Sequence, residues 1–244
     1  MIRGELIKSE GLGLDHDPNF NWRGQAVTRI ENLSDIAFAL ALSMLVAGSG
    51  TPQTFQDLGR FLFSIIPVAA GFSVLLGIWH GHFTFFRRYG VADNRIIFIN
   101  AALIFVVLYM AYPLRFAFDS LFAFIMMQLG NGQMMYELGI MDFDTSGIII
   151  TYFATAYAIA HFLLALMYRH ALKNRELLQL SDYEITVTKR EIFTRYGLAL
   201  LATFVALVAY FTILNGMAGA LLFLTFLPYG LANKIHPDKV KQAN

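Results

Sequence analysis

Six long apolar runs constrain the fold of this chain more than any other feature. A bilayer core about 30 Å thick needs about 20 apolar residues at a rise of about 1.5 Å each. With 57% hydrophobic and 14% charged residues, the 244-residue chain is also too apolar for an ordinary soluble domain. We therefore expect an all-α membrane protein with six transmembrane helices, at residues 33–47, 58–86, 95–118, 147–168, 192–214 and 217–232.

The segments outside these runs set the expected domain organisation. Residues 1–28 form a polar N-terminal tail, residues 29–232 one six-helix membrane domain, and residues 233–244 a short basic C-terminal tail. The connections between the runs are of three kinds. We expect turns at residues 48–54 and 215–216, a longer polar loop at 130–147, and a solvated connector at 173–191. The chain has no cysteine, which excludes disulfides, thiolate metal sites and cysteine nucleophiles.

The distribution of basic residues predicts the orientation. An even number of spans puts both termini on one side of the membrane, and nearly all Lys and Arg residues fall on that side. Only Arg60 and Arg115 fall on the other. Because basic residues favour cytoplasmic loops, we expect a multi-pass cell-membrane protein with both termini in the cytoplasm. The opposite side carries more acidic than basic residues, which would favour cations near an entrance.

The first apolar run starts with an unusual group of polar residues, Arg29, Glu31, Ser34 and Asp35. One interpretation is a simple helix cap, in which Asn32 caps the helix and Asp35 lies near the positive end of the helix dipole. This interpretation does not account for the pattern that follows the cap.

Beyond the cap, Ile36, Leu40, Ser43, Met44 and Ala47 share one broad face of a helix with 3.6 residues per turn. Several copies of this face around an axis would place a hydrophobic ring next to a ring of hydroxyls, the composition of a pore that gates by dewetting. Ser43 is equally compatible with close helix packing through a small residue. One chain offers one such face, so a pore would require an oligomer.

Two motifs resemble those of the TMEM175-type potassium channels. The first is RxExLSD at residues 29–35, and the second is WxxHxxxF at residues 79–86, followed by Asp93 and Asn100. Together they cover about the first 115 residues. The sequence departs from the family pattern at Leu33, where the family has Phe, and at Ser43, where Thr is common.

The resemblance implies a function and a set of roles. Single-repeat members of this family are homotetramers in which the first helix of each subunit lines a central potassium pore. By position, Leu40 would form the narrowest ring and Ser43 a hydroxyl ring, with Met44 and Ala47 completing the constriction. The residues that would hold this helix, away from the ion path, are Arg29, Ser34, Asp35, Trp79, His82 and Asn100. A carboxylate at the centre of a membrane helix costs about 2.5–3.5 kcal/mol, so Asp35 should lie near the interface and have partners.

Histidines at two places and one filter motif bear on other kinds of site. His80 and His82 lie about 200° apart on a helix, so they cannot chelate one metal ion from one face. His161 lies inside the fourth run, where it is either a functional ionisable group or a polar packing residue. The filter sequence Thr-Val-Gly-Tyr-Gly is absent, so selectivity would need another device.

These observations predict a channel subunit rather than an enzyme, because no set of nucleophile, base and acid is recognisable. The expected partners are potassium ions, the lipid bilayer and copies of the chain, with no cofactor and no nucleic acid. The alternative is a proton-coupled secondary transporter, in which Asp35, His82 and His161 would titrate, although the sequence shows neither internal repeats nor broken helices. A non-conducting membrane scaffold is the third candidate.

Overall fold

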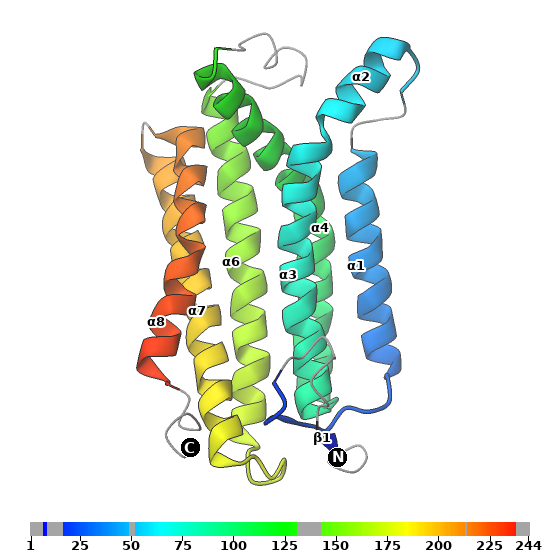
Figure 1. Cartoon of the computed structure of the whole chain (residues 1–244), viewed down its shortest axis with the longest axis vertical. Helices are drawn as coiled ribbons and strands as arrows, with labels where there is room; N and C mark the ends of the chain where they lie inside the picture. Colours follow the sequence, from blue (N-terminus) through cyan, green and yellow to red (C-terminus); the bar gives the residue numbers. More distant parts are fainter. Residues whose placement is uncertain (1–6, 9–16, 49–51, 131–142, 213, 238–244) are drawn as a thin grey trace.

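The computed structural model describes residues 7–8, 17–48, 52–130, 143–212 and 214–237, and this part of the chain is almost entirely helical (Figure 1). Six helical segments are long and apolar enough to cross a membrane, which confirms the expected all-α fold. The helices are α1 (Arg29–Ala47), α2 (Phe55–Phe63), α3 (Ile65–Tyr89), α4 (Asn94–Gln128), α6 (Phe143–Lys173), α7 (Asp182–Phe211), the 3₁₀ helix η1 (Asn215–Thr225) and α8 (Phe226–Ile235). Two short strands, β1 (Ile7–Lys8) and β2 (Asn21–Trp22), pair antiparallel.

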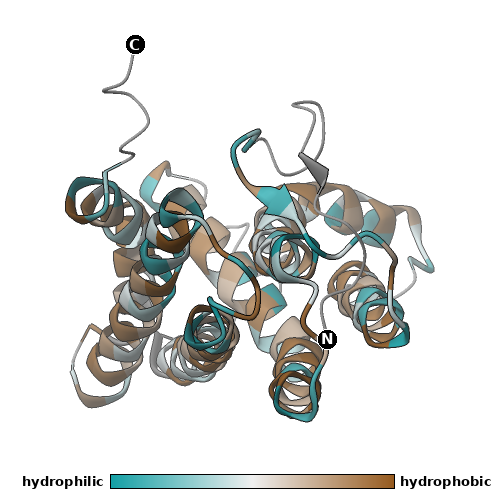
Figure 2. Cartoon of the chain, turned by 90° about the horizontal axis from the view of Figure 1, so that it is seen from below, coloured by the Kyte–Doolittle hydropathy of each residue, from teal (hydrophilic) through white to brown (hydrophobic). Residues whose placement is uncertain are grey.

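The spans form two groups of three. Helices α1, α3 and α4 pack on one another, as do α6, α7 and the η1–α8 segment, and the groups meet mainly where α4 packs on α6. Figure 2 shows the bundle from the end at which α1 begins and α8 ends, which we call the terminal end; the opposite end is the distal end. One cluster of buried apolar residues runs through both groups.

Local sequence explains where several helices begin and end. Thr28 caps α1 and Ser181 caps α7, each in a capping box with a glutamate three residues later, and Asp93 caps α4. The interpretation of Asn32 as the cap of α1 is therefore wrong. Helix α3 ends at Gly90, whose φ of 61° suits glycine.

Two of the expected spans are wrong in detail, because each is divided. The run at 58–86 is divided at Ser64 into α2 and α3. Pro67 has no N–H to donate to the carbonyl of Phe63, so one continuous helix would leave that bond unmade. The run at 217–232 is divided between η1 and α8, where Pro228 has the same effect on the carbonyl of Leu224.

Other boundaries differ because helices continue beyond the membrane-length runs. Helices α4 and α6 extend past the expected 95–118 and 147–168, so the expected loop at 130–147 ends earlier, and α7 begins ten residues before the expected 192. The expected solvated connector at 173–191 is thus largely helical, and its Glu184 is fully buried. Residues 131–142 of the expected loop, 49–51 of the expected turn at 48–54 and 238–244 of the expected C-terminal tail lie outside the described residues.

Residues 17–24, which we call the N-terminal strap, pack against the terminal end instead of forming a free polar tail. Phe20 and Arg23 are fully buried. The backbone N–H groups of Arg23 and Gly24 donate to the carbonyl of Arg87 at 3.1 and 3.0 Å. A Cβ on Gly24 would meet the carbonyl oxygen of Phe86 at 2.0 Å, so only glycine allows this approach.

Candidate functional site

The first turn of α1 is fixed to α3 through Glu31. In the capping box, the carboxylate of Glu31 accepts a hydrogen bond from the N–H of Thr28 at 3.0 Å. Its other oxygen accepts one from Nη2 of Arg87 at 3.0 Å, and both side chains of this ion pair are largely buried. Arg87 also donates to the carbonyl of Gly24 at 2.8 Å. The start of α1 is therefore tied both to the end of α3 and to the N-terminal strap.

One turn further along α1, a buried hydrogen-bond chain connects α1, α4 and α3. The amide Nδ2 of Asn100 donates to Oγ of Ser34 at 2.9 Å, and Ser34 donates to the carbonyl of Ile30 at 2.8 Å. The Oδ1 of Asn100 lies 2.8 Å from Nε2 of His82. All three side chains are buried. The structure thus brings together three residues of the two motifs from three different helices.

The other motif residues differ in their surroundings. Nε1 of Trp79 donates to Oδ1 of Asp35 at 2.8 Å, which links α3 to the same turn of α1. Asp35 is exposed in the single chain, as is Leu33. Arg29 is also exposed and makes no hydrogen bond or ion pair with any residue that the structure describes.

The distal end of α1 has a support that the sequence did not suggest. Nη1 of Arg115 on α4 donates to the carbonyl of Leu45 at 3.2 Å, and its Nε donates to Oδ2 of Asp119 at 2.6 Å. Arg115 and Asp119 are both buried, and they lie at the end of the bundle opposite the termini, the side on which the sequence placed Arg115. The sequence signal is an arginine and an aspartate four residues apart inside an apolar run.

The face of α1 that points away from α3 and α4 is left uncovered in the single chain. Ile36 and Leu40 are 67% and 52% exposed. Ser43 is exposed and donates to the carbonyl of Ala39 at 2.8 Å, which leaves its oxygen lone pairs free to accept. Ala47 is exposed too.

Met44, which the sequence places on the same face, is only partly exposed and packs against the buried cluster. The uncovered face of α1 thus differs from the predicted one, because Met44 is partly covered while Leu33, Ala39 and Val46 are also exposed. Ser43 and Ala47 also line a groove that α1 forms with Phe61 of α2 and Phe72 of α3.

Asp93 connects the start of α4 to α6. Its carboxylate accepts from the N–H of Ile96 at 2.9 Å and lies 2.6 Å from Nε2 of His170. Burial raises the pKa of the Asp93 carboxyl, but these two hydrogen bonds outweigh it and hold the pKa below its ordinary value.

His161 is buried in α6, apart from the network around α1. Its ring stacks edge-on against Tyr157, with centroids 4.4 Å apart. Neither ring nitrogen has a hydrogen-bond partner among the residues that the structure describes. The neighbouring helix α7 contributes the buried Arg195, whose Nη2 donates to Glu191 at 3.3 Å.

Three comparisons relate the chain to known proteins. A family model described as the endosomal/lysosomal potassium channel TMEM175 matches residues 29–110, which include both motifs. A protein of Marivirga tractuosa named potassium channel is 36% identical, and the match covers 72% of each chain. A crystal structure of a variant of the potassium channel MtTMEM175, in complex with a nanobody–MBP fusion protein, is similar with a TM-score of 0.74 and 30% identity. That match covers 90% of this chain and 97% of the other.

Proposed function

The chain belongs to the TMEM175 family, and from this premise we propose that it is a subunit of a potassium channel in which α1 lines the conduction path. The relatives named above are potassium channels, and conduction needs a path through the membrane. The observation that carries the proposal is the uncovered face of α1. The helix is fixed to α3 and α4 on one side, while Ile36, Leu40 and Ser43 face outward on the other.

The exposed face also explains why the channel needs several copies. A single α1 cannot enclose a path, so the uncovered faces of several subunits must meet around an axis. We propose four copies. In this assembly Leu40 forms the constriction, Ser43 contributes a ring of hydroxyls next to it, and Ala47 lies one turn towards the distal end. Met44 contributes less than the other three because it is partly buried.

The motif residues act in this proposal by holding the pore helix. Ser34, Asn100 and His82 fix its rotation through buried hydrogen bonds, and an unmade bond there would cost about 1–3 kcal/mol. Asp35 and Trp79 fix the same turn from α3. Arg29, at the terminal end, faces the water on the side that we propose to be cytoplasmic, where both termini lie.

The test is ion flux through the purified protein in liposomes. Exchange of a potassium isotope between vesicles with equal potassium inside and outside should be rapid only when the protein is present, and its initial rate should not change when a proton gradient is imposed. Flux that requires the proton gradient and saturates with potassium would identify a coupled carrier and overturn the proposal. Subunit counting by native mass spectrometry tests the assembly, and a monomer that still conducts would refute the pore made by several α1 helices.

A further inference from the structure

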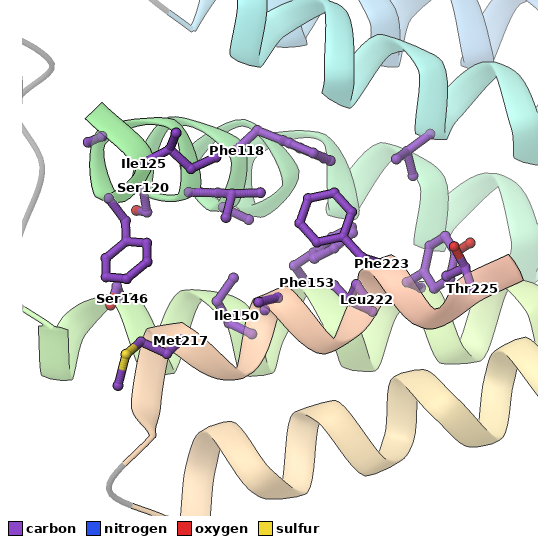
Figure 3. A pocket seen from close by; sticks show the side chains of 18 residues that line it. Phe118, Ser120, Ile125, Ser146, Ile150, Phe153, Met217, Leu222, Phe223 and Thr225 are labelled. Carbon is purple, nitrogen blue, oxygen red and sulfur yellow. The ribbon is translucent and has the colours of Figure 1, made fainter. Parts of the chain in front are cut away.

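A cavity of about 580 Å³ separates the two groups of spans in the distal half of the bundle (Figure 3). It lies between α4 and η1, with α6 behind, and α3 contributes only Val74. Its volume falls in the range of about 300–1,000 Å³ that is typical of ligand sites. The cavity belongs to neither the uncovered face of α1 nor the hydrogen-bond network that holds it.

We propose that this cavity binds an acyl chain of a bilayer lipid from the leaflet at the distal end. The cavity lies within segments that are long and apolar enough to span the membrane, so the phase outside its mouth is lipid hydrocarbon. None of its 18 lining residues is charged, and its deep walls include the buried Ala117, Ile150 and Phe153. An apolar cavity of this kind does not hold water well.

The mouth and the length of the cavity fit one acyl chain. Ile125, Met217 and Phe223 line the cavity and are substantially exposed, so it opens at the surface between α4 and η1. Along α6, its lining runs from Ser146 to Tyr157, eleven residues apart, or about 16 Å at about 1.5 Å per residue. This equals roughly half of a bilayer core of about 30 Å, which is the depth that one leaflet's acyl chains fill.

The way the two groups are joined explains why a cavity forms here. Towards the terminal end, Tyr168 of α6 donates to the carbonyl of Gly81 in α3 at 3.0 Å, and Tyr89 of α3 lies 2.7 Å from Thr188 of α7. At the distal end, η1 packs tightly on α6, where a Cβ on Gly219 would meet Cδ1 of Ile150 at 2.9 Å. Residues of α4 and η1 line the cavity between these contacts, and an acyl chain there would supply the van der Waals contacts that their side chains lack.

A second copy of the chain is the competing occupant. No residue of α1 lines the cavity, so subunits that meet through the uncovered face of α1 need not cover it. A lipid chain reaches the mouth in every assembly that leaves this side towards the bilayer. The lipid is therefore the occupant that the geometry favours.

The experiment is photo-crosslinking in vesicles of phosphatidylcholine that contain a phosphatidylcholine with a diazirine in the middle of one acyl chain. After irradiation, labelled peptides are mapped by mass spectrometry. A segment packed only against other protein side chains would not be labelled. We expect the buried α6 segment from Ile150 to Tyr157 to be labelled, because the acyl chain would lie against it. Absence of label there, with label only on exposed helix surfaces, would overturn the proposal and would be the result if a second copy fills the cavity.

Two cavity-filling variants and one control sharpen the test. Ala220→Phe and Ser120→Phe place a ring in the cavity and should each lower labelling of the 150–157 segment several-fold. Ala102→Phe adds the same ring on the exposed surface of α4 and should leave that labelling unchanged. Having two fillers on different helices keeps the test valid if one of them fails to fold, as judged by its thermal unfolding. Labelling that neither folded filler reduces would count against the site.

Discussion

At the scale of single residues, the two sides of α1 differ in how far their side chains are buried. Ser34, on the packed side, is fully buried, while Leu40, six residues later, is more than half exposed. At membrane depth such a side chain can face lipid, a neighbouring subunit or a narrow apolar constriction. In the assembly that we propose, Leu40 lies at the constriction.

Leu40→Ala should increase passive potassium flux several-fold in the liposome assay, because the smaller side chain widens the constriction and makes it easier to wet. Leu200→Ala is the matched control, since it makes the same change at an exposed position of α7. Equal flux in the wild-type protein and both variants would remove Leu40 from the constriction.

Asn100→Ala should lower the free energy of unfolding by about 1–3 kcal/mol or more, because Ser34 and His82 would each lose a buried partner. Asn94→Ala, at an exposed position on the first turn of the same helix, is the control. Thermal unfolding in detergent measures both. If the two variants unfold at the same temperature, the buried chain does not stabilise α1.

At the scale of elements, α4 acts as a strut for α1. It holds α1 near one end through Asn100 and Ser34, and near the other through Arg115 and the carbonyl of Leu45. The positive charge of Arg115 is also favourable at the negative C-terminal end of the α1 dipole. Two attachment points along one rigid helix fix both the tilt and the rotation of α1.

Arg115→Met should destabilise the protein by about 3–5 kcal/mol, because it leaves the carboxylate of Asp119 buried without its partner. The double variant Arg115→Met/Asp119→Leu should recover much of this loss, since no unpaired charge then remains. Chemical unfolding of the single and double variants measures the coupling. A double variant that is as unstable as the sum of the single ones would show that the pair is not coupled.

At the scale of the whole molecule, the N-terminal strap joins the two groups of helices. All five N–H groups of Arg23 are used: Nε donates to the carbonyl of Leu178, and the Nη atoms donate to the carbonyls of Asn21 and Gln179 and to both carboxylate oxygens of Glu184. The backbone N–H of Arg23 donates a hydrogen bond to the carbonyl of Arg87 near the end of α3. One arginine thus links α3 to the segment between α6 and α7.

Arg23→Met should lower the free energy of unfolding by about 3–5 kcal/mol, because Glu184 would remain buried without a counter-charge. Arg60→Met removes an arginine from an exposed ion pair with Asp57 and should change stability little. Unfolding followed by circular dichroism compares them. Similar losses in both variants would mean that the strap does not join the two groups.

The sequence by itself determined the membrane class, the number of spans and the motif residues around Ser34 and Asn100, because apolar runs of membrane length and polar residues inside them are local signals. It did not indicate which prolines divide a span: the runs are divided near Pro67 and Pro228, whereas α4 continues through Pro113. Nor did it indicate the buried strap or the Arg115 support, which depend on which distant segments meet. A polar residue such as Arg23 looks the same in a sequence whether it is solvated or fully satisfied inside the fold, and only the tertiary structure supplies its partners.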